Sequence, residues 1–235
     1  MDDFFSRSEA LLGVEAMESL LSKRVILFGV GGVGSWCAEC LIRTGLTHLT
    51  IVDGDIVQAS NINRQLPATR ETLGKPKVHI LKERLLTINP KAEIKAINAM
   101  YKPVPSLLDG MAFSDFQLEE YDYIIDAIDD VAAKTDLILR ATRVKGLKIF
   151  CSMGAALRFD PTKVTVGELM DIKGDALAKA VRARMKKTGM KPYRKVRCVY
   201  STEQAQQCET RGSLMQVTAV FGCTLAGLVI NDVFK

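Results

Sequence analysis

The sequence predicts an α/β fold built on a doubly wound, mostly parallel sheet. Short apolar runs alternate with segments of helical periodicity over the first two thirds of the chain, as in parallel strands joined by crossover helices. The 235 residues are 48% hydrophobic and 25% charged, which supplies a large core and argues against disorder. We expect residues 1–155 to form the main domain and residues 156–235 to form an α+β extension of it.

The predicted elements follow one another in strand–helix order. Apolar runs that end in glycine or polar residues predict strands at 24–29, 48–53, 92–99, 121–129 and 147–152. Helical periodicity predicts helices at 33–45, 75–89, 103–118 and 131–146. A long polar loop is expected from the second strand to Gly74. The last third is less regular and is expected to contain VTVGEL, a basic helix at 174–187, KVRCVYS and a final apolar helix.

The final apolar run, residues 214–230, is short for a membrane span and contains polar residues. We therefore expect a core or dimer-interface helix, and no membrane. The first residues lack the basic start and the apolar run of an export signal. The six cysteines are expected to be reduced thiols, and the predicted location is cytoplasmic.

Positive charge is concentrated in residues 173–197. This segment holds ten Lys or Arg and one acidic residue, a net +9 against +5 for the whole chain. Such a patch favours a polyanion, because phosphate contacts supply most of the nonspecific affinity for nucleic acids. The residues expected to contact RNA are Lys179, Arg182, Lys186, Lys187, Lys191, Arg194, Lys195 and Arg197.

A glycine-rich stretch, GVGGVG, lies between the first predicted strand and the first predicted helix, as in the nucleotide fingerprint of Rossmann-like folds. Its glycines allow a tight turn, close approach to a phosphate and close helix packing. They are Gly29, Gly31, Gly32 and Gly34. Asp53 ends the second predicted strand, where a carboxylate accepts hydrogen bonds from ribose hydroxyls.

Two cations, Arg64 and Lys77, follow the second strand. A redox enzyme that binds a dinucleotide needs no such pair of cations, because the glycine turn already holds the pyrophosphate. The pair suits a triphosphate, since the two cations would neutralise the triphosphate and its pyrophosphate leaving group. Asn61 and Gln65 would add hydrogen bonds. These residues predict ATP as the nucleotide.

Asp126 and Asp129 lie at the end of the fourth predicted strand. Ligands of open parallel sheets bind outside the carboxyl ends of the strands, so both carboxylates are expected at the nucleotide site. A carboxylate beside phosphates suits Mg²⁺, and we predict Asp129 as its ligand.

Taken together, GVGGVG with Asp53, NINRQ, GKPK and DAIDD resemble the E1-like ATP-dependent activating family. That family includes enzymes that adenylate sulfur-carrier proteins and the ubiquitin-activating enzymes. The resemblance implies that Asp53 binds ribose, that Arg64 and Lys77 bind phosphates, and that Asp129 acts with Mg²⁺ in catalysis. Arg7 resembles the arginine that family members insert into a partner subunit's ATP site, which implies a homodimer.

The last third resembles the tRNA threonylcarbamoyladenosine dehydratase branch of that family. The matching stretches are DPTKVTVGELMDI, DALAKAVRARMKK, VRCVYSTE and VTAVFG. The resemblance implies a tRNA substrate that carries threonylcarbamoyladenosine, which suits the basic segment. The sulfur-carrier branch instead holds zinc on two Cys-x-x-Cys pairs. This chain has one such pair, Cys37 and Cys40, so no zinc is expected.

The implied reaction is adenylation of the threonyl carboxylate by ATP, followed by ring closure with release of AMP and net loss of water. A cysteine relay through Cys198 or Cys208, a monovalent cation and a sulfur-transfer protein partner stay open. The alternatives are an adenylyltransferase for a ubiquitin-like sulfur carrier, an NAD-binding oxidoreductase and a non-catalytic RNA-binding module. The pair Arg64 and Lys77 argues against the oxidoreductase.

Overall fold

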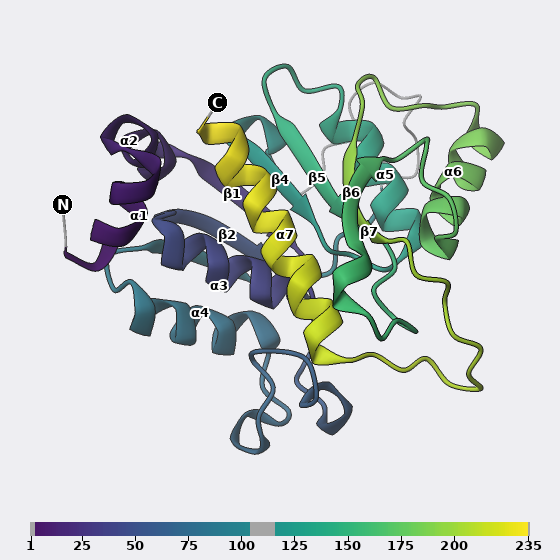
Figure 1. The fold of residues 1–235 in the computed structure, drawn as a ribbon, viewed down its shortest axis with the longest axis horizontal. Helices are drawn as coiled ribbons and strands as arrows, with labels where there is room; N and C mark the ends of the chain where they lie inside the picture. The colour runs from purple at the N-terminus through teal and green to yellow at the C-terminus, as the bar shows by residue number, and fades with distance from the viewer. Residues whose placement is uncertain (1–2, 104–115, 235) are drawn as a thin grey trace.

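The computed structural model describes residues 3–103 and 116–234, which form a seven-stranded sheet with helices on both faces (Figure 1). The strands are β1 (Arg24–Phe28), β2 (His48–Val52), β3 (Glu93–Ile97), β4 (Tyr123–Asp126), β5 (Lys148–Ser152), β6 (Val164–Glu168) and β7 (Arg197–Ser201). The α-helices are α1 (Ser6–Leu12), α2 (Val14–Ser22), α3 (Gly34–Thr44), α4 (Lys77–Ile88), α5 (Val131–Ala141), α6 (Ala176–Thr188) and α7 (Met215–Val233). The predicted α/β class is confirmed.

The strand order is β3-β2-β1-β4-β5-β7-β6, and every pair is parallel except β6 with β7. The chain builds outward from β1 to β3 and then returns to the other side of β1 with β4. The direction of winding therefore reverses between β1 and β4. In doubly wound sheets a crevice opens at such a point, beyond the carboxyl ends of the strands.

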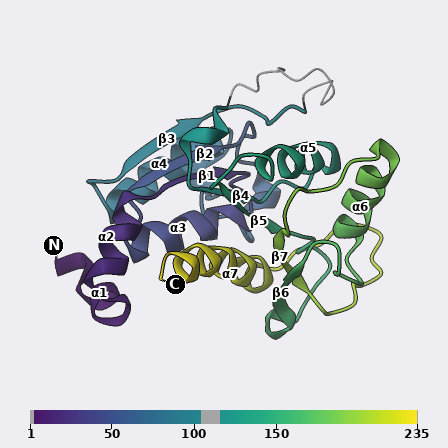
Figure 2. The same ribbon diagram turned by 90° about the horizontal axis from the view of Figure 1, so that it is seen from above.

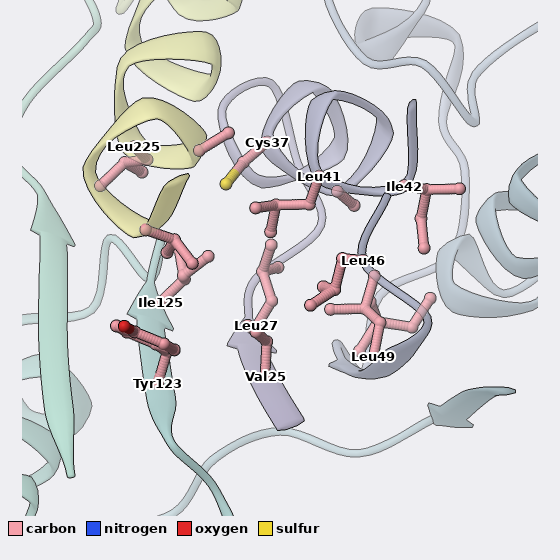
Figure 3. Close-up of a cluster of buried hydrophobic side chains, with 14 of the residues drawn as sticks. Val25, Leu27, Cys37, Leu41, Ile42, Leu46, Leu49, Tyr123, Ile125 and Leu225 are labelled. Atoms are coloured by element: carbon pink, nitrogen blue, oxygen red, sulfur yellow. The ribbon is translucent and has the colours of Figure 1, made fainter. Parts of the chain in front are cut away.

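Side chains of β1 alternate between two apolar cores. Val25 and Leu27 belong to a core with residues of α3, α4 and α7, whereas Ile26 and Phe28 belong to one with residues of α5 and α6. Figure 3 shows the first core, where Leu41 of α3 and Leu225 of α7 close over β1 and β4. This period of two is what a strand buried on both faces requires. Figure 2 shows α3 and α7 on one side of the sheet and α5 on the other.

Among the described residues, α7 is the one helix that is long and apolar enough to cross a membrane. Of its most apolar 18 residues, however, 44% are buried inside the protein. It packs lengthwise along α3 and contacts β5, β6 and β7. Its packing agrees with the core helix that the sequence predicts.

The structure differs from the sequence predictions in several segments. Helices α1 and α2 were not predicted, α5 ends at Ala141, and β4 ends at Asp126. The polar loop after β2 contains two short 3-10 helices, Ala59–Asn61 and Arg70–Thr72. Most of the helix predicted at 103–118 lies outside the described residues.

Candidate nucleotide-binding crevice

A cavity of about 550 Å³ opens beyond the carboxyl ends of β1, β2, β4 and β5. Its wall is made by the glycine turn after β1, the loops after β2, β4 and β5, the start of α6 and the segment before α7. Figure 1 shows the loop after β2 and the segment before α7 at the same end of the molecule. The two segments are joined by a hydrogen bond from Asn63 Nδ2 to the carbonyl of Ser213, at 2.9 Å. A second cavity, of about 600 Å³, lies at the opposite end of β2 and contains none of the predicted site residues.

The glycine turn needs glycine for two separate reasons. Gly29 has a φ of +86°, and a Cβ there would lie 2.8 Å from the carbonyl oxygen of Ala127. A Cβ on Gly34 would lie 1.8 Å from the carbonyl oxygen of Gly29, because α3 begins tightly against β1. Gly31 and Gly32 line the cavity and present backbone to it. The turn can therefore bring N–H groups to a phosphate at the start of α3.

Asp53 lines the cavity and fixes the glycine turn. Its Oδ2 accepts from Val30 N and its Oδ1 from Asp55 N, each at 2.8 Å. Burial raises the pKa of the Asp53 carboxyl, and the two backbone hydrogen bonds oppose this rise. Each oxygen keeps a second lone pair, which can accept from a ribose hydroxyl.

The NINRQ stretch places two side chains on the cavity wall. Arg64 is half-buried, and its Nη1 donates to the Ser60 carbonyl at 2.8 Å. Gln65 is 8% exposed, and its buried Oε1 has no hydrogen-bond partner among the described residues. Asn61 does not line the cavity. Its Oδ1 accepts from Gln58 N, and its carbonyl accepts from Arg64 N and Gln65 N. Asn61 thus holds the loop, whereas Arg64 and Gln65 face the cavity.

Lys77 begins α4 and is 5% exposed on the cavity wall. Its Nζ lies 2.8 Å from Asp55 Oδ2, and its backbone N donates to the Asp55 carbonyl. The Lys77 ammonium is therefore held beside the Asp53–Asp55 turn. Because a nearly buried ammonium is weakly screened by water, it acts strongly on an anion in the same cavity.

The aspartate that ends β4 and the two that follow it lie in three different environments. Asp126 is fully buried and pairs with Lys134 of α5 at 2.8 Å, so it does not line the cavity. Burial raises the pKa of Asp126, and the Lys134 charge opposes this rise. Asp130 caps α5 through Ala133 N. Asp129 is exposed on the cavity wall without a hydrogen bond or ion pair to any described residue. It is the carboxylate free to hold a cation beside phosphates.

The far wall of the cavity is formed by residues that the sequence analysis did not predict. The loop after β5 contributes Ser152 to Arg158, the start of α6 contributes Asp175, and the segment before α7 contributes Arg211. Arg158 is 3% exposed, and its Nε and Nη1 have no hydrogen-bond partner among the described residues. The one signal for Arg158 was its position shortly after the predicted fifth strand, because ligands bind beyond strand ends.

The eight predicted RNA-binding residues are all described, and none of them lines the cavity. Seven are exposed, namely Lys179, Lys186, Lys187, Lys191, Arg194, Lys195 and Arg197. Arg194 and the half-buried Arg182 also bind backbone. Arg194 Nη2 donates to the Ala141 and Val144 carbonyls, and Arg182 Nη1 donates to the Leu169 carbonyl. The segment is thus a charged outer surface around α6. It begins beside the cavity, at the start of α6, and ends with Arg197 at the start of β7, on the edge of the sheet away from the cavity.

Three further candidates lie away from the cavity wall. Arg7 is exposed on α1, at the opposite end of the molecule from α6 (Figures 1 and 2). Cys198 is fully buried in β7, whereas Cys208 is an exposed free thiol in the segment before α7. Among the described residues, no group of three or more His, Cys, Asp or Glu is arranged to hold a metal ion.

A family model described as the ThiF family matches residues 5–234, almost the whole chain. This chain belongs to the ThiF family. The match includes the segments that carry the glycine turn, Asp53, Arg64 and Lys77.

One relative of this ThiF-family chain is the tRNA threonylcarbamoyladenosine dehydratase of Bacillus subtilis (strain 168), which is 37% identical over 199 residues. That match covers 85% of this chain and 74% of the relative. A crystal structure of E. coli tRNA N6-threonylcarbamoyladenosine dehydratase in complex with ATP has a TM-score of 0.85 at 32% identity. It covers 97% of this chain and 93% of that one.

A second group of ThiF-family relatives matches a smaller part of the chain. The molybdopterin-synthase adenylyltransferase of Escherichia coli (strain K12) is 33% identical over 123 residues, which is 52% of this chain and 46% of that protein. The dehydratase likeness extends over β6, α6, β7 and α7, because it covers almost the whole chain.

Proposed function

We propose that this protein is an ATP-dependent tRNA threonylcarbamoyladenosine dehydratase. The observation that carries the proposal is the likeness, over 97% of the chain, to a dehydratase structure in complex with ATP. The crevice between β1 and β4 supplies the nucleotide-binding groups that such an enzyme needs. The reaction would activate the threonyl carboxylate of the modified adenosine and close a ring with net loss of water.

In the proposed complex, ATP lies across the switch point, with its ribose on Asp53 and its phosphates over the glycine turn. Arg64 and Lys77 would stabilise the charge that develops on the pyrophosphate leaving group. Gln65, whose Oε1 is buried and unpartnered, would gain a hydrogen-bond donor from the nucleotide or its water. Mg²⁺ fits Asp129, because this cation binds one or two carboxylates together with substrate phosphates. Bound there, Mg²⁺ would neutralise phosphate charge.

The chemistry needs two displacements. A threonyl carboxylate oxygen attacks the α-phosphorus, and the bond from that phosphorus to the bridging oxygen of pyrophosphate breaks. A nucleophile within the carbamoyl-threonyl group then attacks the acyl carbon and releases AMP. The protein's task is to hold the two reactants together, and such positioning accounts for a large part of the rate enhancement in bimolecular reactions.

The surface around α6 is the proposed tRNA contact. Its exposed lysines and arginines line none of the cavity, and they extend from the start of α6, beside the cavity, toward the opposite edge of the sheet. This arrangement suits phosphate contacts that position a nucleic acid. We further propose a homodimer in which Arg7 reaches a partner's ATP site, because α1 lies far from the cavity of its own chain. A cytoplasmic location is proposed with this function, and the six free thiols suit it.

An adenylyltransferase for a ubiquitin-like sulfur carrier is the second candidate. What favours it is the 33% identity with the molybdopterin-synthase adenylyltransferase, but that likeness covers about half of the chain. It leaves the concentrated positive charge of residues 173–197 without a role.

The test is to incubate the protein with ATP, Mg²⁺ and tRNA that carries threonylcarbamoyladenosine, and to measure the nucleoside mass and AMP release. We expect the nucleoside to lose one water and AMP to form in equal amount. Arg64→Ala should abolish both products, while Arg70→Ala, an exposed change in the same loop, should leave them unchanged. Pyrophosphate exchange that requires a carrier protein ending in Gly-Gly, with no change in the tRNA, would contradict the proposal.

A further inference from the structure

Arg158 is a buried charge that no carboxylate of the described residues neutralises. It is 3% exposed, and no described carboxylate lies within ion-pair distance of it. Its one hydrogen bond is a long one of 3.4 Å from Nη2 to the Gly174 carbonyl, and its Nε and Nη1 have no partner among the described residues. An arginine keeps its charge in proteins, and buried charges are normally paired. The missing partner is therefore expected to be a ligand of the cavity that Arg158 lines.

The surrounding backbone holds Arg158 in place without neutralising it. Leu157 N donates to the Gly212 carbonyl and the Leu157 carbonyl accepts from Gln206 N, both at 2.9 Å. Leu157 has a φ of +61°, which is uncommon for a branched residue. Asp175, the acidic residue of this wall, already accepts from Gly154 N and Ala178 N. It forms no ion pair with Arg158.

Arg158 lies apart from Arg64 and Lys77, the two cations that we propose bind the phosphates. Arg64 and Lys77 follow β2, on one side of the glycine turn, whereas Arg158 follows β5, on the other. Adjacent strands lie about 4.8 Å apart, so the β5 loop begins roughly 10 Å from the turn after β1, with β4 between them. A group that attacks the α-phosphorus must approach opposite the leaving pyrophosphate. It therefore approaches from the side on which Arg158 lies.

We propose that Arg158 binds the carboxylate of the acyl substrate and positions it for adenylation. This inference rests on the proposed function. The guanidinium is a planar fork that matches a carboxylate, so Nε and Nη1 can hold it through one or both of its oxygens. One carboxylate oxygen forms the new bond to the α-phosphorus, and the bridging oxygen of pyrophosphate leaves with the electron pair of the bond that breaks. Arg158 takes no proton and is unchanged.

The experiment compares one tRNA with and without the threonylcarbamoyl group on its adenosine. Dissociation constants for both forms are measured with a non-hydrolysable ATP analogue, together with ATP affinity and the melting temperature of the free protein. The variants are Arg158→Gln and Arg158→Lys. Arg24→Gln is the control, because Arg24 is an exposed arginine at the start of β1, away from the cavity.

We expect wild type to prefer the modified tRNA, and Arg158→Gln to reduce that preference about ten- to hundredfold, the effect of losing a charge-assisted hydrogen bond. Affinity for the unmodified tRNA and for ATP should stay within about twofold of wild type. Arg158→Lys should restore part of the preference. The melting temperature of free Arg158→Gln should stay the same or rise, because an unpaired buried charge is removed.

Three results with Arg158→Gln would overturn the inference. The first is that the variant keeps the full preference for modified tRNA, the second that it weakens ATP binding instead, and the third that it lowers the melting temperature and all affinities together. The second result would make the ligand a phosphate, and the third would make the role structural. Wild type that neither prefers modified tRNA nor releases AMP with it would overturn the proposed function, and this inference with it.

Discussion

The two halves of the crevice differ in how far the protein pairs its own buried or half-buried charged side chains. In the nucleotide half, the glycine turn with Asp53, Arg64 and Lys77, each of these side chains bonds to protein atoms at 2.8 Å. In the substrate half, residues 152–158 with the start of α6, Arg158 leaves two nitrogens unpartnered and Leu157 has a positive φ.

The difference separates two ways of preparing a site. Preformed hydrogen bonds in the nucleotide half fix donors and charges before ATP arrives, so that little reorganisation accompanies the reaction. The substrate half instead keeps a buried charge that gains its partner when the ligand binds. Such a charge lowers the stability of the free protein and favours the ligand that neutralises it.

The largest effect is expected at the buried ion pair beneath the crevice. Lys134→Met should lower the free energy of unfolding by about 3–5 kcal/mol, because it leaves Asp126 buried and unpaired. Urea unfolding measures the loss. The double variant Asp126→Asn, Lys134→Met should recover much of it, since no buried charge remains. An equal loss in both variants would mean that packing, rather than the charge, carries the cost. This ion pair thus contrasts with Arg158, whose neutralisation is expected not to destabilise the protein.

Lys77→Ala should lower turnover about a hundredfold while leaving stability nearly unchanged. The ammonium is nearly buried beside the nucleotide site, whereas its partner Asp55 is half exposed and can be solvated after the change. Removing one preorganised donor from developing charge has an effect of about this size. Lys75→Ala removes an exposed cation two residues earlier and should keep wild-type turnover. Turnover of Lys77→Ala within about fivefold of wild type would mean that the phosphates do not contact this residue.

The nucleotide half was predictable because its signals are local in sequence. A strand, GVGGVG and a helix specify the turn, and Asp53 directly follows the next strand. The positions of Asp126 and Asn61 could not be predicted. The sequence around a carboxylate at the end of β4 is the same whether that carboxylate faces the crevice or pairs with Lys134 of α5. Likewise, the sequence does not show that Asn61 bonds within its own loop instead of facing the cavity. Arg158 was missed for the same reason. Its burial depends on α6 and on the segment before α7, which meet it only in the folded chain.

The smallest effect tests whether strain is confined to the substrate half. Leu157→Gly should be more stable than Leu157→Ala by about 1 kcal/mol, because only glycine adopts a φ of +61° without the cost of a Cβ. For a chain of this length the difference is about 2–4 °C in melting temperature. Comparing glycine with alanine removes the leucine side chain from both variants, so the difference reports the backbone. If alanine proves as stable as glycine, the loop relaxes to negative φ without cost, and the substrate half is as free of backbone strain as the nucleotide half. A clear gain for glycine, with weaker binding of the modified tRNA, would mean that the strained turn holds Arg158 in its binding position.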